Sequence, residues 1–203
     1  MSKTKDNEKI TVQHSKVSAE LIRAFQAGDR AAFNTLVVMY KNVVFHMCFR
    51  MLGDYQEADD TAQEVFVRVF TSIKKFRFES AFSTWLYRIT VNMCKNRLSS
   101  SEYRHKDKMV RIHNPSEKGN AFIDIEDKSQ SPHGALEKKE RSLIIHEAMQ
   151  KLPEEQKIVV VLRDIQGLSY EEIASITGLK SGTVKSRLAR ARLALRQQLK
   201  GVI

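Results

Sequence analysis

The C-terminal end of the chain collects side chains that bind nucleic acids. No acidic residue follows Glu172, whereas basic residues recur to the end: Lys180, Lys185, Arg187, Arg190, Arg192, Arg196 and Lys200. Hydroxyls and backbone amides at a helix start bind phosphate, and Lys and Arg reach base edges in the major groove. Helical spacing leaves five residues mostly off the apolar side, and we predict that they contact duplex DNA: Thr183, Lys185, Ser186, Arg187 and Arg190.

Local signals around these residues predict two helices joined by a tight corner. Ser169 and Glu172 form a capping box, which starts the first helix. Gly178 permits the left-handed backbone that the corner needs. Apolar residues repeat at helical spacing in both helices: Ile173, Ala174 and Ile176, then Val184, Leu188, Ala191 and Leu195. We therefore predict a DNA-binding helix-turn-helix from Leu168 to Leu199. The alternative is a solvated basic face on a structural helix, and the corner signature argues against it.

The rest of the chain is predicted to be helical as well. Apolar residues at three- and four-residue steps define helices within residues 18–98, most clearly from Ala62 to Ile73, and another helix is expected to start near Ser83 or Thr84. Residues 99–135 are rich in Ser, Asn, Lys, Asp and Glu and contain helix breakers such as Pro132, which predicts a flexible linker with a transient turn at 121–125. The predicted fold class is all-α, with two small helical domains: an N-terminal bundle (18–98) and a C-terminal helix-turn-helix domain (136–203). A flexible linker (99–135) joins them, and a disordered tail (1–17) precedes the first.

Composition limits the partners and the compartment. The 203 residues carry a formal net charge of +10, which favours a polyanionic partner, either nucleic acid or an anionic membrane surface. Residues 1–17 lack the apolar core of a signal peptide, and the longest apolar run, Ile158–Leu162, is far shorter than a membrane span, so we expect a cytoplasmic protein. Cys48 and Cys94 are expected to be buried and reduced. No His/Cys cluster has metal-ligand spacing, so no metal, cofactor or catalytic site is predicted.

Two stretches resemble a known family. The letters LSYEEIA from Leu168 and GTVKSRLARAR from Gly182 are similar to region four of bacterial sigma factors. The letters EADDTAQEVF from Glu57 and FSTWLYRI from Phe82, followed by Asn92, resemble region two. Because only a linker separates the two regions, the chain resembles the extracytoplasmic-function group. The resemblance covers about Ala19 to Leu98 and Leu136 to Leu199.

The resemblance implies an alternative sigma factor that binds core RNA polymerase and promoter DNA. In the family, region four contacts the −35 element, which would involve the five residues predicted above to bind duplex DNA. The polymerase-binding residues would be Asp59, Asp60, Gln63 and Glu64, which lie off the apolar side of their helix. The −10 element and its melted strand would be bound by Arg77, Arg88, Asn92, Lys95 and Asn96. Relatives are commonly held inactive by an anti-sigma factor.

The segment from Phe76 to Asn96 has the chemistry that single-strand binding requires. Aromatic residues, which can stack on bases, alternate with cations, which can follow the phosphates. Trp85 shares a helical side with Leu86 and Ile89, so we expect it in the core instead. Phe78 occupies a position where many relatives have Gly, so the sequence does not determine the shape of the strand-binding loop. Ala189 is small where a bulkier residue is common, which leaves one −35 contact in question.

Two other functions compete with this interpretation. A conventional helix-turn-helix regulator would bind DNA without polymerase and use the N-terminal bundle as a sensor. A nuclease would use Asp59, Asp60 and Glu64 as metal ligands. Asp59 and Asp60 are adjacent and therefore diverge on a helix, which argues against the nuclease. A DNA footprint obtained without polymerase would favour the regulator.

Overall fold

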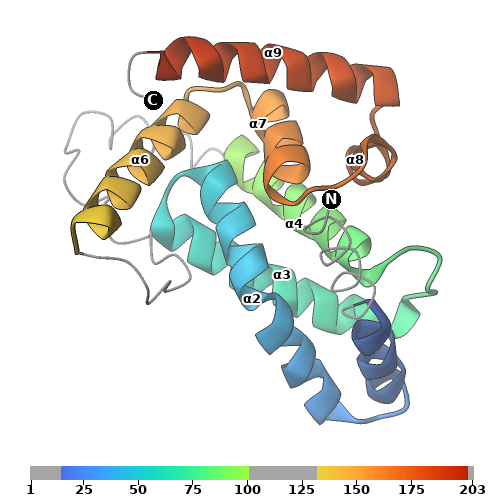
Figure 1. Ribbon diagram of the computed structural model, residues 1–203. Helices are drawn as coiled ribbons and strands as arrows, with labels where there is room; N and C mark the ends of the chain where they lie inside the picture. The colour runs from blue at the N-terminus through green and yellow to red at the C-terminus, as the bar shows by residue number, and fades with distance from the viewer. Residues whose placement is uncertain (1–14, 101–131, 201–203) are drawn as a thin grey trace, which may run out of the picture.

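The structure is a computed structural model that describes residues 15–100 and 132–200, and these residues fold into helices joined by short connections (Figure 1). The N-terminal unit (residues 15–100) contains a helix at 15–26, α2 (Arg30–Leu52), α3 (Tyr55–Ser72), the 3₁₀ turn η1 (Ile73–Lys75) and α4 (Phe82–Ser99). The C-terminal unit (residues 132–200) contains α6 (Pro132–Gln150), α7 (Glu154–Val160), the π-helical turn η3 (Val161–Ile165), α8 (Tyr170–Thr177) and α9 (Ser181–Leu199). The all-α prediction is confirmed.

Short polar residues and a glycine fix the ends of the N-terminal helices. Asp29 caps α2 by accepting a hydrogen bond from the Ala31 amide at 2.9 Å, and Asp54 caps α3 through the Glu57 amide at 2.9 Å. Gly53 ends α2 with a φ of 82°, a left-handed conformation that favours glycine. These caps fold the chain back so that α2, α3 and α4 pack on one another around a fully buried apolar core.

Two helix starts differ from the sequence expectation. The α4 helix begins at Phe82, with Ala81 as an N-cap that makes no side-chain hydrogen bond, although Ser83 and Thr84 suggested a later start. The α6 helix begins at Pro132, so residues 132–135 are helical where a linker was predicted. Proline breaks a helix interior but is favourable in the first turn, which explains this second difference. The predicted turn at 121–125 and the predicted tail up to residue 14 lie outside the described residues.

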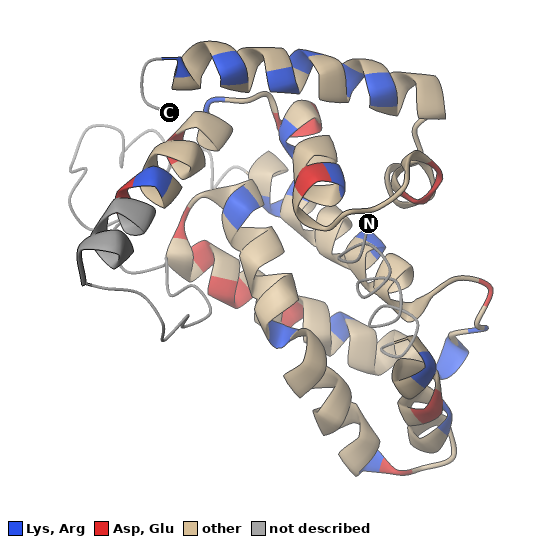
Figure 2. Ribbon diagram, in the orientation of Figure 1, with Lys and Arg blue, Asp and Glu red and all other residues tan. Residues whose placement is uncertain are grey.

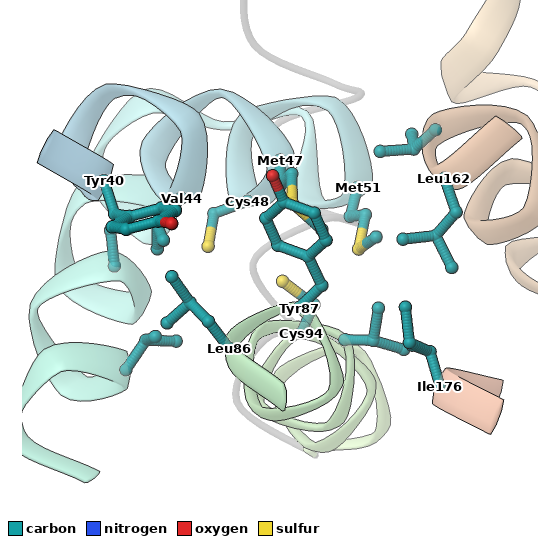
Figure 3. Close-up of a cluster of buried hydrophobic side chains, with 14 of the residues drawn as sticks. Tyr40, Val44, Met47, Cys48, Met51, Leu86, Tyr87, Cys94, Leu162 and Ile176 are labelled. Atoms are coloured by element: carbon teal, nitrogen blue, oxygen red, sulfur yellow. The ribbon is translucent and has the colours of Figure 1, made fainter. Parts of the chain in front are cut away.

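The two units pack against each other in a closed arrangement. The α8 helix lies on α4, while α6, α7 and η3 lie on the end of α2 (Figure 1). Leu162 and Ile176 of the C-terminal unit join Met51 and Tyr87 of the N-terminal unit in a continuous buried cluster (Figure 3). The sequence predicted two domains but not this arrangement. Within residues 15–100 and 132–200, no helix combines the length and apolarity that a membrane span requires.

Candidate nucleic-acid and polymerase interfaces

The C-terminal helix pair has the predicted local geometry. The Ser169 amide donates to Glu172 Oε2 at 2.8 Å and the Glu172 amide donates to Ser169 Oγ at 3.2 Å, which completes the capping box. Gly178 ends α8 with a φ of 73°. Val184 and Leu188 of α9 are buried together with Ile173 of α8. The result is a helix-turn-helix whose second helix, α9, has one buried and one exposed side.

Basic residues recur along the whole length of α9, and no acidic residue lies among them (Figure 2). Lys185, Ser186 and Arg190 are exposed along it, with Ala189 between them. Residues at this spacing form a continuous strip on a helix. We call Lys185, Ser186, Ala189 and Arg190 the α9 strip. The two cations and the hydroxyl of the strip are groups that can bind base edges in a DNA major groove. Ala189, in the middle of the strip, has a small side chain that does not project between them.

Two of the five residues predicted to bind duplex DNA are less exposed to solvent than the α9 strip. Thr183 is half-buried near the start of α9. Arg187 is also half-buried, and its guanidinium forms an ion pair with Glu155 of α7 at 2.6 Å. Farther along α9, Arg192 is paired with Asp164. Sequence periodicity could not identify these pairings because the partners lie on other helices.

A second polar surface lies on α4. Arg88, Asn92 and Asn96 are exposed and Lys95 is half-buried, at a spacing that places them on one side of the helix. We call these four residues the α4 face. Amides and cations on one side of a helix can bind base edges and phosphates. The C-terminal unit approaches this face, because Arg88 Nη2 donates to Ser175 Oγ of α8 at 2.8 Å.

The loop before α4 carries Arg77, which is exposed, and an unusual backbone. Among the residues that the structure describes, Phe78 is the one non-glycine residue with a positive φ, 58°. Glycine adopts a positive φ readily, which explains why it suits this position. The backbone of the strand-binding loop takes this left-handed shape although a phenylalanine stands there. The Phe78 ring packs edge-on against Phe76 at 5.0 Å between centroids, and the Arg23 guanidinium lies 4.9 Å from its centroid.

The start of the same loop is held by the first helix. Gln26 Nε2 donates to the carbonyls of Ile73 and Phe76, both at 3.1 Å. Trp85 packs 5.2 Å from Phe76 and 5.8 Å from Phe82, so its ring belongs to the aromatic core, as expected. The loop that carries the exposed Arg77 is therefore anchored by packed aromatic rings at its ends.

A third polar surface lies on α3, opposite the side that carries Val65 and Val69 into the core. Gln63 and Glu64 are exposed and Asp59 and Asp60 are half-buried, so all four predicted residues lie on the outside of the helix. Gln63 Nε2 donates to Asp59 Oδ2 at 2.9 Å. We call these four residues the α3 acidic face. No group of three or more His, Cys, Asp and Glu within the described ranges is arranged to hold a metal ion.

One contact near this face was not predicted. Glu57, which is buried at the start of α3, accepts from Arg97 Nε near the end of α4 at 2.5 Å. The pair joins the helix of the α3 acidic face to the helix of the α4 face. Helical spacing could not predict this pair because its partners are 40 residues apart. Together, the helix-turn-helix and the polar surfaces on α4 and α9 are typical of a protein that binds nucleic acid.

Comparison with known proteins identifies the family. Residues 36–103 match the model of sigma-70 region 2 and residues 142–195 match that of sigma-70, region 4. The RNA polymerase sigma-H factor of Pseudomonas aeruginosa is 38% identical over 186 residues, covering 91% of this chain and 94% of the relative. The ECF RNA polymerase sigma-E factor of Escherichia coli is 36% identical over 185 residues, covering 90% and 94%.

Two solved structures share the fold. CnrH in complex with the cytosolic domain of CnrY has a TM-score of 0.61 at 24% identity, covering 92% of this chain and 96% of that one. The sigma factor RpoE from Bartonella quintana, in complex with the anti-sigma factor NepR, has a TM-score of 0.60 at 23% identity, covering 83% and 97%.

The chain therefore belongs to the extracytoplasmic-function (ECF) sigma factors of the sigma-70 family. It is an alternative sigma factor, which initiates transcription together with core RNA polymerase at promoter DNA. The competing interpretation, a regulator that acts without polymerase, is not favoured by these matches.

Proposed function

We propose that the three polar surfaces divide the work of promoter recognition. The α3 acidic face binds core polymerase, the α9 strip binds the −35 element, and the α4 face with Arg77 binds the −10 element and its melted strand. In this assignment residues 18–98 act as the region 2 domain and residues 136–203 as the region 4 domain. The observation that carries the proposal is that each surface gathers polar residues on the side of its helix opposite the buried residues.

Each surface has the chemistry of its proposed partner. The α9 strip offers cations and a hydroxyl, which bind phosphate and the edges of guanine and adenine. Thr183 and Arg187 would flank the strip, and Arg187 would exchange Glu155 for a DNA contact. The α4 face offers two amides beside cations, as a single strand requires. The protein binds and positions DNA but catalyses no reaction itself, and it acts in the cytoplasm with the polymerase.

The assignment is tested by transcription with purified components. Run-off transcription with core polymerase on a library of genomic promoters should enrich templates that share two elements at a fixed spacing. Lys185→Ala with Arg190→Ala should reduce promoter binding by about thirtyfold or more, because each of the two contacts to a base edge contributes about 1–3 kcal/mol of discrimination and 1.4 kcal/mol corresponds to about tenfold. Arg196→Ala, an exposed cation six residues beyond the strip, is the matched control.

Polymerase binding is tested separately. Asp60→Ala with Gln63→Ala should impair co-purification with core polymerase while the far-ultraviolet circular dichroism stays unchanged. Glu147→Ala with Gln197→Ala removes an exposed acid and an exposed amide elsewhere and should leave co-purification intact. Normal recovery of polymerase with the first variant would refute the docking role of the α3 acidic face.

We also propose that an anti-sigma factor binds the chain. The support is the shared fold with the RpoE of Bartonella quintana, whose solved complex contains the anti-sigma factor NepR. Affinity purification of the tagged chain from its own cells should recover a stoichiometric protein that is absent from the polymerase-bound fraction. Recovery of polymerase alone under every growth condition tested would contradict this part of the proposal.

A further inference from the structure

The end of α2 is bonded by two side chains of the other unit. Gln150 Nε2, at the end of α6, donates to the Arg50 carbonyl at 3.0 Å. Lys157 Nζ, from α7, donates to the Met51 carbonyl at 3.2 Å and to Gln150 Oε1 at 2.6 Å. The last carbonyls of a helix lack donors within that helix, and they form the negative end of its dipole. An amide and an ammonium from the C-terminal unit therefore complete the end of an N-terminal helix.

The fit between the two units is close at this point. Lys157 is buried, with 7% of its surface exposed, although lysine is almost never fully buried without a partner. A Cβ on Gly53 would lie 2.8 Å from Gln150 Cδ, so any other residue at this position would displace the end of the glutamine side chain. Next to these contacts, His146 of α6 stacks on Phe49 of α2 with 4.5 Å between ring centroids.

The closed arrangement conflicts with promoter binding. Two promoter elements separated by about two turns of DNA lie ~70 Å apart. Modules that share one buried core cannot span that distance, and α8 lies on α4 with Ser175 bonded to Arg88 of the α4 face. The chain must therefore open before it can contact both elements. The polar contacts at the end of α2 oppose opening, because separation would break each of them.

We propose that Gln150 and Lys157 form an autoinhibitory latch, which keeps the C-terminal unit closed on the N-terminal unit until polymerase and promoter hold them apart. The proposal rests on the proposed function, since inhibition is defined by it. A charged hydrogen bond supports closure more strongly than a neutral one, so Lys157 contributes more to the latch than Gln150 does. Gln150 orients the ammonium of Lys157 by accepting one of its hydrogen bonds. Because only the open chain can contact both promoter elements, the apparent affinity for promoter DNA is reduced by the fraction of molecules that are closed.

The test measures opening and activity in the full-length chain. Dyes on Asn34→Cys and Gln197→Cys, both at exposed positions, report the distance between the units by fluorescence energy transfer, since Cys48 and Cys94 are buried. The parent should give one compact population. Lys157→Met, which keeps the volume but removes the donors, should raise the ratio of open to closed molecules by about tenfold. The same change should raise run-off transcription at limiting protein concentration by up to about tenfold.

Controls separate opening from damage. Lys151→Met removes the same charge from an exposed position six residues away and should behave like the parent. If Lys157→Met loses helical content, Gln150→Ala, at a half-buried position, replaces it in the same measurements. An open parent, unchanged energy transfer in the latch variants, or opening without a gain in transcription would overturn the latch. Absence of transcription from every protein, with energy transfer altered as expected, would instead refute the proposed function.

Discussion

The two helices proposed to bind DNA, α4 and α9, are supported in different ways. Seven of the eighteen residues of α4 are buried, because α2 and α3 cover one side and α8 covers another. Three of the nineteen residues of α9 are buried, and basic residues such as Lys185, Arg190 and Arg196 are exposed along it. Substitutions in α4 should therefore change folding and domain closure together, whereas substitutions in α9 should change binding with little effect on folding.

The largest effect is expected at the ion pair between α4 and α3. Arg97→Ala leaves the Glu57 carboxylate buried without its 2.5 Å partner, which should lower the free energy of unfolding by about 3 kcal/mol in urea denaturation. Adding Glu57→Gln to Arg97→Ala should recover part of that loss, because a neutral amide is less costly to bury. A fall in the free energy of unfolding of less than about 1 kcal/mol would be no larger than that for an exposed ion pair. It would show that the stability of α4 depends on its packing partners no more than that of α9 does.

The second prediction concerns Tyr87, where α4 meets the C-terminal unit. Burial, with the nearby Tyr40 and Glu172, raises the pKa of Tyr87 to about 12 from its ordinary 10.0. Below pH 10 the phenol is neutral in both states. Between pH 10 and 12 the unfolded chain releases the proton and the folded chain retains it, so stability falls as pH rises.

Tyr87→Phe should remove this contribution, which amounts to about 2 kcal/mol by about pH 11.5. The measurement compares urea unfolding of the parent and of Tyr87→Phe at several pH values from 9 to about 11.5. The other tyrosines are common to both proteins, so their titration cancels in the difference. Parallel profiles would show that Tyr87 is not desolvated, and that the contact between α4 and α8 is looser than described.

A smaller effect is expected in the loop before α4. Phe78→Ala keeps a side chain at a φ of 58° and loses the ring contacts with Phe76 and Arg23. Phe78→Gly loses the same contacts but removes the backbone strain, which is about 1 kcal/mol or slightly more for an L-residue. The glycine variant should therefore unfold at a higher temperature than the alanine variant. Equal melting temperatures would indicate that the loop changes shape when the ring is removed.

The smallest effect is expected on α9. Arg187→Ala breaks an ion pair with Glu155, whose side chain is 64% exposed, so the free energy of unfolding should change by less than about 1 kcal/mol. Duplex binding is the informative measurement, because Arg187 was predicted to contact DNA. Weaker binding at unchanged stability would assign Arg187 to the DNA interface, and unchanged binding would assign it to the pairing with α7 alone.

Sequence periodicity predicted the features that depend on neighbouring residues. The capping box at Ser169, the corner at Gly178 and the apolar side of α9 are local, so their residue types specify them. The position of the α9 strip follows from the same helical spacing. Phe78 could be noted as a departure from glycine, and the positive φ explains what that departure means.

Features that depend on partners far along the chain could not be predicted in this way. The pairing of Arg187 with Glu155, of Glu57 with Arg97 and of Lys157 with the end of α2 each joins different helices. Lysine and glutamine are common on exposed helix sides, so neither Gln150 nor Lys157 is distinguished by type or spacing. The start of α6 at Pro132 was also missed, because proline was interpreted as a breaker and not as a first-turn residue.

The two cysteines have a practical consequence for kinetics. Cys48 of α2 and Cys94 of α4 are buried in the core that joins these helices, and contact with Cys48 together with burial raises the pKa of the Cys94 thiol. A thiolate is the reactive form, so alkylation in the native state must await a transient opening of the bundle. The rate at which a small thiol reagent modifies the unlabelled chain therefore measures how often α4 separates from α2. Comparison with the polymerase-bound protein would show whether polymerase binding slows that motion.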